Sequence, residues 1–520
     1  MLYFKNQPPE KAAFLFPTRA SRCASHLKTT EPEHIIETIT GITIQTTTIA
    51  QRNLQEAPMN PKQTLLQMGI ALSLLACSNG GTTPPTGTNS KPTINAFTVT
   101  PDTGTSITQV KLEWDVTAAS KLEISSSSGS NIGTVTPLDK GSSTLSAVTT
   151  QTFTLKASNA NGETSKTATV TLTGPKFTTV ETVAGQVGVR GGADGNGNLA
   201  SFNYPNGVAV TKAAGSTGNE VIVYITALNE SIRYAQVGYA GNPVGTAIGL
   251  GSSGSVDGPP ATAQVRAPNG IAIGYDSAAY EAFAYWTEDD SCVVRKLTDY
   301  PLNGNRKAVT VAGKAYTCGA ADGVGGNARF NRPRGIVANT RTGEVFVADS
   351  SNRTIRRIYA DTVTTVAGLA GASGSTDGAG ASARFTAPTG IALDRQENLI
   401  VTDYLTIRKI TPSGEVSTIA GKAGEPGSKD GTRAEARFKG LDGLAIDEVG
   451  NIYVSDLGNQ TIRKITPDGT VSTVAGVIGV AGAADGGITS ATFNDPHGLA
   501  YYNKQLFIAD YSNQTIRRIR

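Results

Sequence analysis

Residues 333–368 read PRGIVANTRTGEVFVADSSNRTIRRIYADTVTTVAG, and this stretch decides the fold of most of the chain. Short apolar runs rich in Val and Ile alternate with turn residues, which is typical of consecutive β-strands. The runs predict four strands, at Gly335–Ala338, Glu344–Ala348, Thr354–Tyr359 and Val363–Ala367. Because the connections are short, we expect these strands to form one antiparallel sheet.

The same pattern recurs six times between residues 177 and 520. The recurring elements are Val-Ala-Gly, Asp-Gly, Ala-x-Phe, Pro-x-Gly, a strand ending in Asp, and Ile-Arg-Lys/Arg-Ile; Val265 replaces the Phe in the second copy. The Asp-Gly aspartates are Asp194, Asp257, Asp322, Asp377, Asp430 and Asp485, and the last three periods are 55, 53 and 55 residues. Four strands per repeat predict a β-propeller with one blade per copy.

The repeated pattern resembles the NHL repeat over the whole of 177–520. The elements that carry this resemblance are Pro-x-Gly-Ile-Ala, Asn-Leu-x-Val-x-Asp, x-Ile-Arg-Lys-Ile and Val-x-Thr-Val-Ala-Gly. This resemblance implies a six-bladed propeller. The sixth copy ends after its third strand, whereas Phe177–Gly185 has the character of a fourth strand. We therefore expect 177–185 to complete the last blade, which removes the two open edges of a linear array.

Residues 92–174 predict a small β-sandwich before the propeller. Period-2 strands separated by turns are expected at Ile94–Thr100, Val110–Val116, Lys121–Ser125, Thr152–Ser158 and Thr167–Leu172. Leu112–Val116 and Phe153–Asn159 resemble strands of bacterial immunoglobulin-like domains. The fold class is therefore all-β, a six-bladed NHL-type propeller preceded by an immunoglobulin-like β-sandwich. We expect the sandwich to act as a spacer; a ligand-binding sandwich is the alternative.

The beginning of the chain predicts export. Residues 1–58 show no sustained period, as in coil or in sequence upstream of the true start. Residues 59–77 follow the order of a signal peptide, with Lys62 before a short apolar run that ends at Ala76. Leu74-Leu75-Ala76-Cys77 resembles the bacterial lipobox, which implies lipidation of Cys77 and anchoring to the outer membrane or cell surface. A plain cleaved signal, or a buried helix with a chance cysteine, is the alternative. Residues 78–91 are a flexible linker.

Composition excludes several function classes. The net charge of +3 leaves no broad electrostatic footprint for nucleic acid. Three histidines and no CxxC argue against a zinc or His-rich metal site.

Cys292 and Cys318 lie in two loops on one face of the propeller, so they are a disulfide candidate in an oxidising compartment; two free thiols are the alternative.

Most repeated residues have a structural interpretation. The glycine of Pro-x-Gly permits close backbone approach near the axis, and Asp-Gly suits a turn with positive φ. The Asp that ends the second strand is expected to cap the following loop. Calcium is disfavoured because one Asp per blade is spread around a ring, whereas calcium needs six to eight converging oxygens.

The variable x of Pro-x-Gly is the candidate binding position, because each x starts a blade's first strand at the mouth of the channel. The six occupants are polar and mixed in type within a nearly constant frame: Asn206, Asn269, Arg334, Thr389, Asp442 and His497. Divergence in a constant frame favours a surface that binds a protein, a peptide or a glycan. A solvated rim without a ligand is the alternative.

Catalysis is the second functional hypothesis. The amidating lyases with NHL-like propellers use several histidines on a metal, but only His497 lies in this propeller. Gluconolactonase-like propellers hold a metal with Glu, Asn and Asp; Asn206, Asn269 and Asp442 offer oxygens, but Arg334 shares their ring. Asp442 and His497 lie in adjacent blades and can form an acid–base pair.

We expect a monomeric, non-enzymatic binding or scaffold module without metal or cofactor, with a propeller hydrolase or lyase as the alternative.

Overall fold

The computed structural model describes residues 90–520, except 107, 128–130, 148–149, 214–215, 217, 250, 277–280 and 299–305. The predictions for residues 1–58, for the signal peptide with Cys77 and for the linker up to 89 lie outside the described residues. The described chain is all-β, and its helical segments are single 3-10 turns: η1 (Gly325–Asn327), η2 (Ser350–Asn352), η3 (Gly380–Ser382), η4 (Leu457–Asn459) and η5 (Tyr511–Asn513). None of these described helices is long and apolar enough to cross a membrane.

Two sheets form between residues 93 and 172. Their strands are β1 (Thr93–Thr100), β2 (Thr103–Gly104), β3 (Thr108–Thr117), β4 (Lys121–Ser126), β5 (Asn131–Thr134), β6 (Lys140–Ala147), β7 (Gln151–Asn159) and β8 (Gly162–Leu172). One sheet has the order β1-β3-β6 and the other β2-β8-β7-β4-β5. Alternate residues of these strands point inward, so Leu112, Trp114, Phe153 and Leu155 share one apolar core.

Six sheets follow within the described residues, each built from four consecutive antiparallel strands except the last. We number them sheets 1 to 6. Sheet 1 comprises β10 (Pro205–Lys212), β11 (Val221–Ala227), β12 (Ser231–Val237) and β13 (Val244–Ile248). Sheet 2 comprises β14 (Pro268–Asp276), β15 (Glu281–Glu288), β16 (Val293–Thr298) and β17 (Lys307–Gly313). Sheet 3 comprises β19 (Pro333–Ala338), β20 (Val345–Asp349), β21 (Thr354–Tyr359) and β22 (Thr362–Gly368), with the short β18 (Gly323–Val324).

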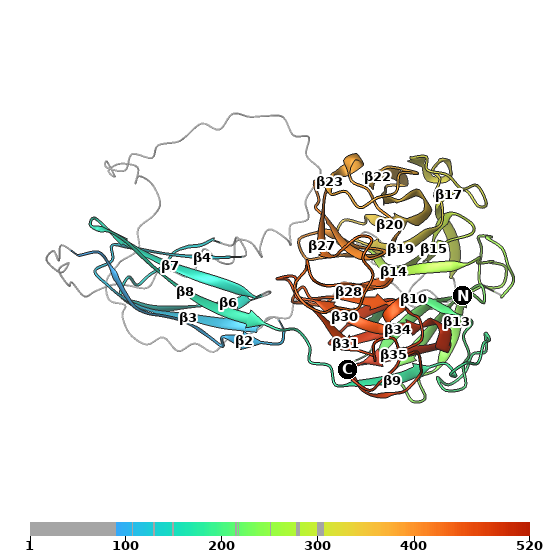
Figure 1. The fold of residues 1–520 in the computed structure, drawn as a ribbon, viewed down its shortest axis with the longest axis horizontal. Coiled ribbons are helices and arrows are strands. Elements are labelled where there is room, and N and C mark those ends of the chain that lie inside the picture. The colour runs from blue at the N-terminus through green and yellow to red at the C-terminus, as the bar shows by residue number, and fades with distance from the viewer. Residues whose placement is uncertain are drawn as a thin grey trace, which may run out of the picture. The chain divides into compact units, whose positions relative to one another are not determined.

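Sheets 4 to 6 repeat this order. Sheet 4 comprises β24 (Pro388–Leu393), β25 (Leu399–Asp403), β26 (Thr406–Ile410) and β27 (Glu415–Gly421), with the short β23 (Gly378–Ala379). Sheet 5 comprises β28 (Leu441–Ile446), β29 (Ile452–Asp456), β30 (Thr461–Ile465) and β31 (Val471–Ala475). Sheet 6 contains β33 (Pro496–Tyr502), β34 (Gln505–Asp510) and β35 (Thr515–Ile519), with the short β32 (Gly486–Gly487). The fourth strand of sheet 6 is β9 (Thr179–Ala184), which pairs antiparallel with β35 (Figure 1).

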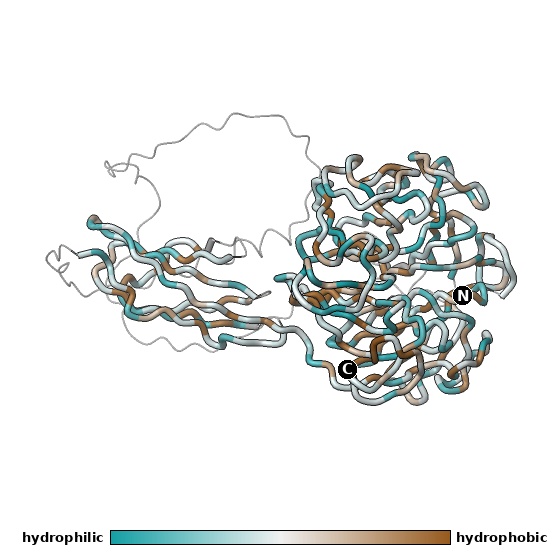
Figure 2. Tube along the Cα trace, in the orientation of Figure 1, coloured by the Kyte–Doolittle hydropathy of each residue, from teal (hydrophilic) through white to brown (hydrophobic). Residues whose placement is uncertain are grey.

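The six sheets close into a ring, as in a β-propeller. The first strand of each sheet contacts the first strand of the next sheet, and β33 of sheet 6 returns to β10 of sheet 1. Apolar side chains fill the space between neighbouring sheets; for example, Ile400 and Ile407 of sheet 4 pack with Leu444 and Val454 of sheet 5. Figure 2 shows apolar residues along the strands and hydrophilic residues in many of the connecting turns.

A buried arginine lies on the third strand of every sheet. In sheet 3, Arg356 Nη1 is 2.7 Å from Asp349 Oδ2 and Nη2 is 2.6 Å from Asp322 Oδ1. The guanidinium lies over Phe330, 5.2 Å from the ring centroid. The equivalent residues are Arg233, Arg295, Arg408, Arg463 and Arg517. A guanidinium buried this deeply is tolerated because carboxylates and backbone carbonyls satisfy its charge.

The repeated aspartates therefore do more than the sequence predicts. Gly323 has a φ of +155°, so Asp322-Gly323 makes the expected turn. Asp349 Oδ2 accepts a hydrogen bond from the Asn352 side chain in the following turn, which fits the expected loop cap, and Oδ1 accepts one from the backbone N–H of Asn331, 18 residues earlier. In addition, both carboxylates bind Arg356, a contact that was not predicted from the repeat.

Candidate functional site at the channel mouth

The glycines of Pro-x-Gly bring the six variable residues into a ring. A Cβ on Gly335 would lie 2.0 Å from the carbonyl oxygen of Thr389 in the next sheet, and one on Gly443 would lie 2.5 Å from that of His497. The contact between Gly498 and the carbonyl oxygen of Asn206 closes the ring. Only glycine permits this approach, so each sheet places its x residue against the start of the preceding sheet.

Hydroxyl groups on the second strands form hydrogen bonds that hold the ring of x residues in place. Thr226, Thr287, Thr402 and Ser455 each donate to the carbonyl oxygen of the x residue in the following sheet, at 2.5–2.6 Å. Sequence reasoning missed these hydroxyls, although their position, one residue before the end of the second strand, is visible in four copies. The ring backbone is therefore rigid, and the side chains are what differ around it.

Asp442 and His497 are in direct contact across adjacent sheets. Asp442 Oδ2 lies 2.8 Å from His497 Nδ1, and the two side chains are 14% and 20% exposed. Burial opposes ionisation of Asp442, but His497, Arg334 and Thr389 outweigh it, and the pKa of Asp442 is lowered. Asp442 therefore carries a negative charge at neutral pH.

An aromatic stack extends from His497 around the mouth. The His497 ring stacks on Tyr511 with 4.2 Å between centroids, and Tyr511 stacks on Tyr204 at 4.7 Å. The Arg190 guanidinium covers the Tyr204 ring at 4.3 Å. Burial raises the pKa of Tyr511, so its hydroxyl is protonated at neutral pH. Sequence reasoning missed these three partners because they occur once each and are not part of the repeated frame.

The remaining ring residues differ in accessibility. Arg334 is 39% exposed, and its Nε lies 3.8 Å from Asp289 Oδ2, a carboxylate that also faces Arg332 at 3.5 Å. Burial raises the pKa of Asp289, and the two arginines counteract this effect. Thr389 is 7% exposed, and its hydroxyl lies 3.0 Å from that of Thr402. Asn206 and Asn269 are half-buried.

Two further features bear on chemistry. Cys292 and Cys318 form a disulfide with a Cα–Cα distance of 5.4 Å, which ties the loop after β15 to the loop that leads to sheet 3. Among the described residues, no group of three or more His, Cys, Asp or Glu side chains is placed to hold a metal ion.

Comparisons with known proteins support the fold more than a function. No family model matches the chain. The protein SUPPRESSOR OF QUENCHING 1, chloroplastic, of Arabidopsis thaliana is 35% identical over an alignment of 150 residues that covers 26% of this chain. The matched region spans only 14% of that relative's length, so the relative's activity does not transfer.

Solved structures of propeller-like proteins resemble most of the chain. A Bacteroides thetaiotaomicron protein of unknown function is 21% identical with a TM-score of 0.50, covering 84% of this chain and 99% of its own. An auxiliary nutrient binding protein from the same organism is 17% identical with a TM-score of 0.48, covering 83% and 98%. Virginiamycin B lyase from Staphylococcus aureus is 13% identical with a TM-score of 0.36, covering 61% and 97%. Of these three resemblances, the one with a TM-score of 0.50 supports the fold, and at 21% identity it shows the fold alone.

Proposed function

We propose that the chain is a non-enzymatic binding module, a six-bladed NHL-type propeller that presents its channel mouth to a protein, peptide or glycan. In this proposal the immunoglobulin-like sandwich is a spacer, Cys77 carries a lipid anchor, and the protein acts as a monomer outside the cytoplasm. The lipobox resemblance supports export, and the disulfide between Cys292 and Cys318 fits an oxidising compartment.

The observation that carries the proposal is the stack of Arg190, Tyr204, Tyr511 and His497 beside the ring. Stacking holds these rings in place before a ligand binds, and because Arg190, His497 and the neighbouring tyrosine cover the ring faces, the tyrosines offer their polar edges for contact. Arg334 adds a half-exposed cation at the same mouth. This combination of polar ring edges and a cation favours a polar ligand with a carboxylate, as in an acidic glycan or a peptide.

The test is a titration of the full chain with cell-wall peptides and acidic oligosaccharides, followed by calorimetry and thermal shift. We expect one ligand class to bind, and we expect Arg334→Ala and His497→Ala each to weaken binding about tenfold or more. Arg341→Ala is the matched control, because Arg341 is exposed in the turn at the other end of the same strand. Equal affinity in the wild type and both mouth variants would contradict the proposal.

A second candidate function, a propeller hydrolase or lyase, is favoured by the 2.8 Å contact between Asp442 and His497. A carboxylate that holds one imidazole nitrogen orients the other nitrogen for proton transfer. Turnover of a lactone or of an amidated-peptide precursor by the wild type, lost in both His497→Ala and Asp442→Asn, would replace the binding proposal with this one.

A further inference from the structure

One position of the repeat differs in sheet 4. The second strand of every other sheet carries an aromatic residue three places before its last residue: Tyr224, Tyr285, Phe346, Tyr453 and Phe507. Tyr224, Tyr453 and Phe507 are buried between neighbouring sheets, where Tyr224, for example, packs with Ile271 of sheet 2, whereas Tyr285 and Phe346 are half-buried. Sheet 4 has the smaller Ile400 at this position.

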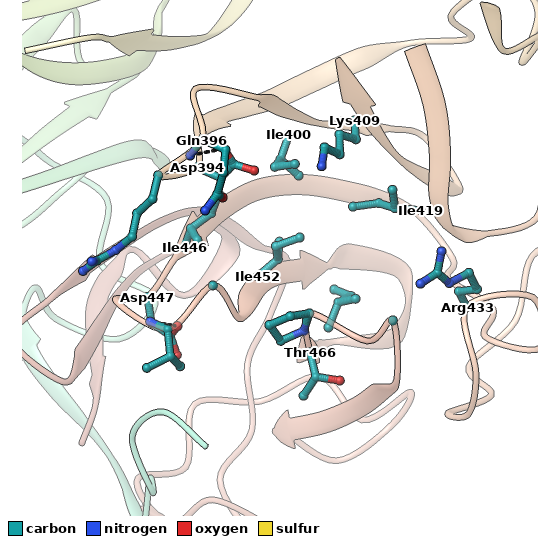
Figure 3. A pocket seen from close by; sticks show the side chains of 16 residues that line it. Asp394, Gln396, Ile400, Lys409, Ile419, Arg433, Ile446, Asp447, Ile452 and Thr466 are labelled. Carbon is teal, nitrogen blue, oxygen red and sulfur yellow. Dashed lines mark hydrogen bonds between the residues drawn. The ribbon is translucent and has the colours of Figure 1, made fainter. Parts of the chain in front are cut away.

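A pocket of about 300 Å³ opens where the aromatic side chain is missing, between sheets 4 and 5 (Figure 3). Its apolar lining comes from Val449, Pro467 and five isoleucines: Ile400, Ile419, Ile446, Ile452 and Ile465. The turn after β24 and the turn after β30 border its opening, so the pocket lies at the strand ends opposite to the channel mouth. A volume of this size suits a small-molecule ligand.

A cation on the pocket wall lacks an acidic partner. Lys409 is half-buried, and its cross-strand neighbours are Ile400 and Ser417. Within the described residues no carboxylate lies within ion-pair distance of Lys409, whereas its counterpart in sheet 3, Arg357, pairs with Glu344 at 2.6 Å. In Figure 3, Lys409 and Arg433 lie on either side of Ile419, and Arg433 donates to the Asp468 carbonyl oxygen.

The two carboxylates in the lining are held by their own loops. Asp394 accepts hydrogen bonds from the backbone N–H of Gln396 and from Asn398. Asp447 accepts from the side chains of Asn451 and Tyr453. Neither carboxylate lies within ion-pair distance of Lys409, and the lining also holds Arg395 and Arg433, so cations border an apolar middle.

We propose that this pocket binds an aromatic carboxylate. The aromatic ring would occupy the place that a Tyr or Phe side chain takes between the other sheets, and the carboxylate would pair with Lys409 and Arg433. Burying a ring stabilises a complex by apolar transfer, and a charge-assisted hydrogen bond to the half-buried lysine selects the anion. The site is separate from the channel mouth and does not rest on the function proposed for it.

The equivalent groove between sheets 3 and 4 supports this choice of ligand. It measures about 370 Å³, but Phe346 stands on its wall. Its cation, Arg357, is already neutralised by Glu344, and Glu397 adds a second carboxylate. This groove therefore offers neither the vacant aromatic position nor the unpaired cation, and we expect it not to bind the anion.

The test uses the full chain with 3-phenylpropionate as the probe, measured by ligand-detected NMR and calorimetry. We expect saturable binding, with its methyl ester about tenfold weaker. Ile400→Phe should abolish binding without lowering the unfolding temperature, because the other sheets accommodate an aromatic residue there. Lys409→Gln should weaken binding about tenfold, and Lys464→Gln, the same position in sheet 5, should leave it unchanged.

Several outcomes would overturn the proposal. No saturable binding of 3-phenylpropionate at about 10 mM would exclude the site. Equal binding by Ile400→Phe would place the ligand elsewhere, and equal binding of the ester by the wild type would exclude the role of Lys409. Should Ile400→Phe unfold, contacts between the probe's ring protons and the isoleucine methyl groups in the wild type decide the location, and their absence counts against the pocket.

Discussion

At the residue scale, the buried arginine is the centre of each sheet. In sheet 3, its two carboxylate partners come from different distances along the chain: Asp322 lies 34 residues before Arg356, and Asp349 lies 7 before it. Where Val265 replaces the repeated Phe, Arg295 lies over Trp286 instead, 5.4 Å from the ring centroid. The cation–π contact with the guanidinium is thus kept, although in sheet 2 the aromatic ring comes from a different position of the repeat.

Removing one of these arginines is expected to destabilise the propeller strongly. Arg356→Met leaves Asp349 and Asp322 without their cation, and a broken buried ion pair costs about 3–5 kcal/mol of unfolding free energy. The neighbouring Arg357→Met is the matched control, because Arg357 is 39% exposed and such pairs contribute less than about 1 kcal/mol. Urea unfolding of both variants measures the difference; equal losses would refute the structural role of Arg356.

The same site predicts a pH dependence. Burial raises the pKa of Asp349 from 3.8 to about 6, although hydrogen bonds and Arg356 oppose the shift. The folded state therefore holds this proton more tightly than the unfolded state. The resulting stability is complete below about pH 4 and is lost as the pH rises through about 6.

Relative to Asp349→Asn, which does not titrate, the wild type should lose unfolding free energy between about pH 4 and about pH 7. Urea midpoints at both pH values measure this loss. Asp361→Asn, at an exposed turn, serves as the control and should follow the wild type at both pH values. A constant difference between wild type and Asp349→Asn would show that Asp349 does not contribute to the pH dependence.

At the element scale, the repeat made the strands of sheets 3 to 6 predictable. The expected strand Thr354–Tyr359 has the bounds of β21, and the other three strands of sheet 3 differ by at most two residues at an end. The sequence missed β6, because KGSSTLSA is polar and only its last residue is buried. The ring of x residues was predictable from its constant frame, whereas the aromatic stack came from single loop residues that no repeat marks.

The close approach of the inner strands predicts a sharp dependence on glycine. Gly335→Ala would place a Cβ 2.0 Å from the Thr389 carbonyl oxygen, which forces two strands apart. We expect a loss of about 3 kcal/mol, at the upper end of overpacking effects. Gly326→Ala, whose Cβ would meet no atom closer than 3.9 Å, should change stability by less than about 1 kcal/mol. Equal stability of the two variants in urea would contradict the ring geometry.

At the scale of the whole molecule, the ring depends on β9. Val180 and Val183 of this strand are buried, and Thr178 and Thr179 donate to the Arg520 carbonyl oxygen, so residues far apart in sequence close the last sheet. The pairing of Arg520 with Thr179 corresponds to that of Tyr359 with Thr362 in sheet 3. There, two turn residues, Ala360 and Asp361, join the strands, and the same turn would join β35 to a β9 moved after Arg520.

Moving β9 to a position after Arg520 therefore tests whether the ring needs only the packing of this strand or also its connection at the N-terminal side. Replacing residues 177–185 with a Gly/Ser linker should abolish cooperative urea unfolding, because β35 loses its partner and apolar surface of sheet 6 is exposed. Appending Ala-Asp and then residues 179–185 after Arg520 should restore one cooperative transition. The linker variant alone unfolding like the wild type would show that closure does not stabilise the ring. Failure of the appended strand to rescue it would show that the covalent connection from the N-terminal side is itself required.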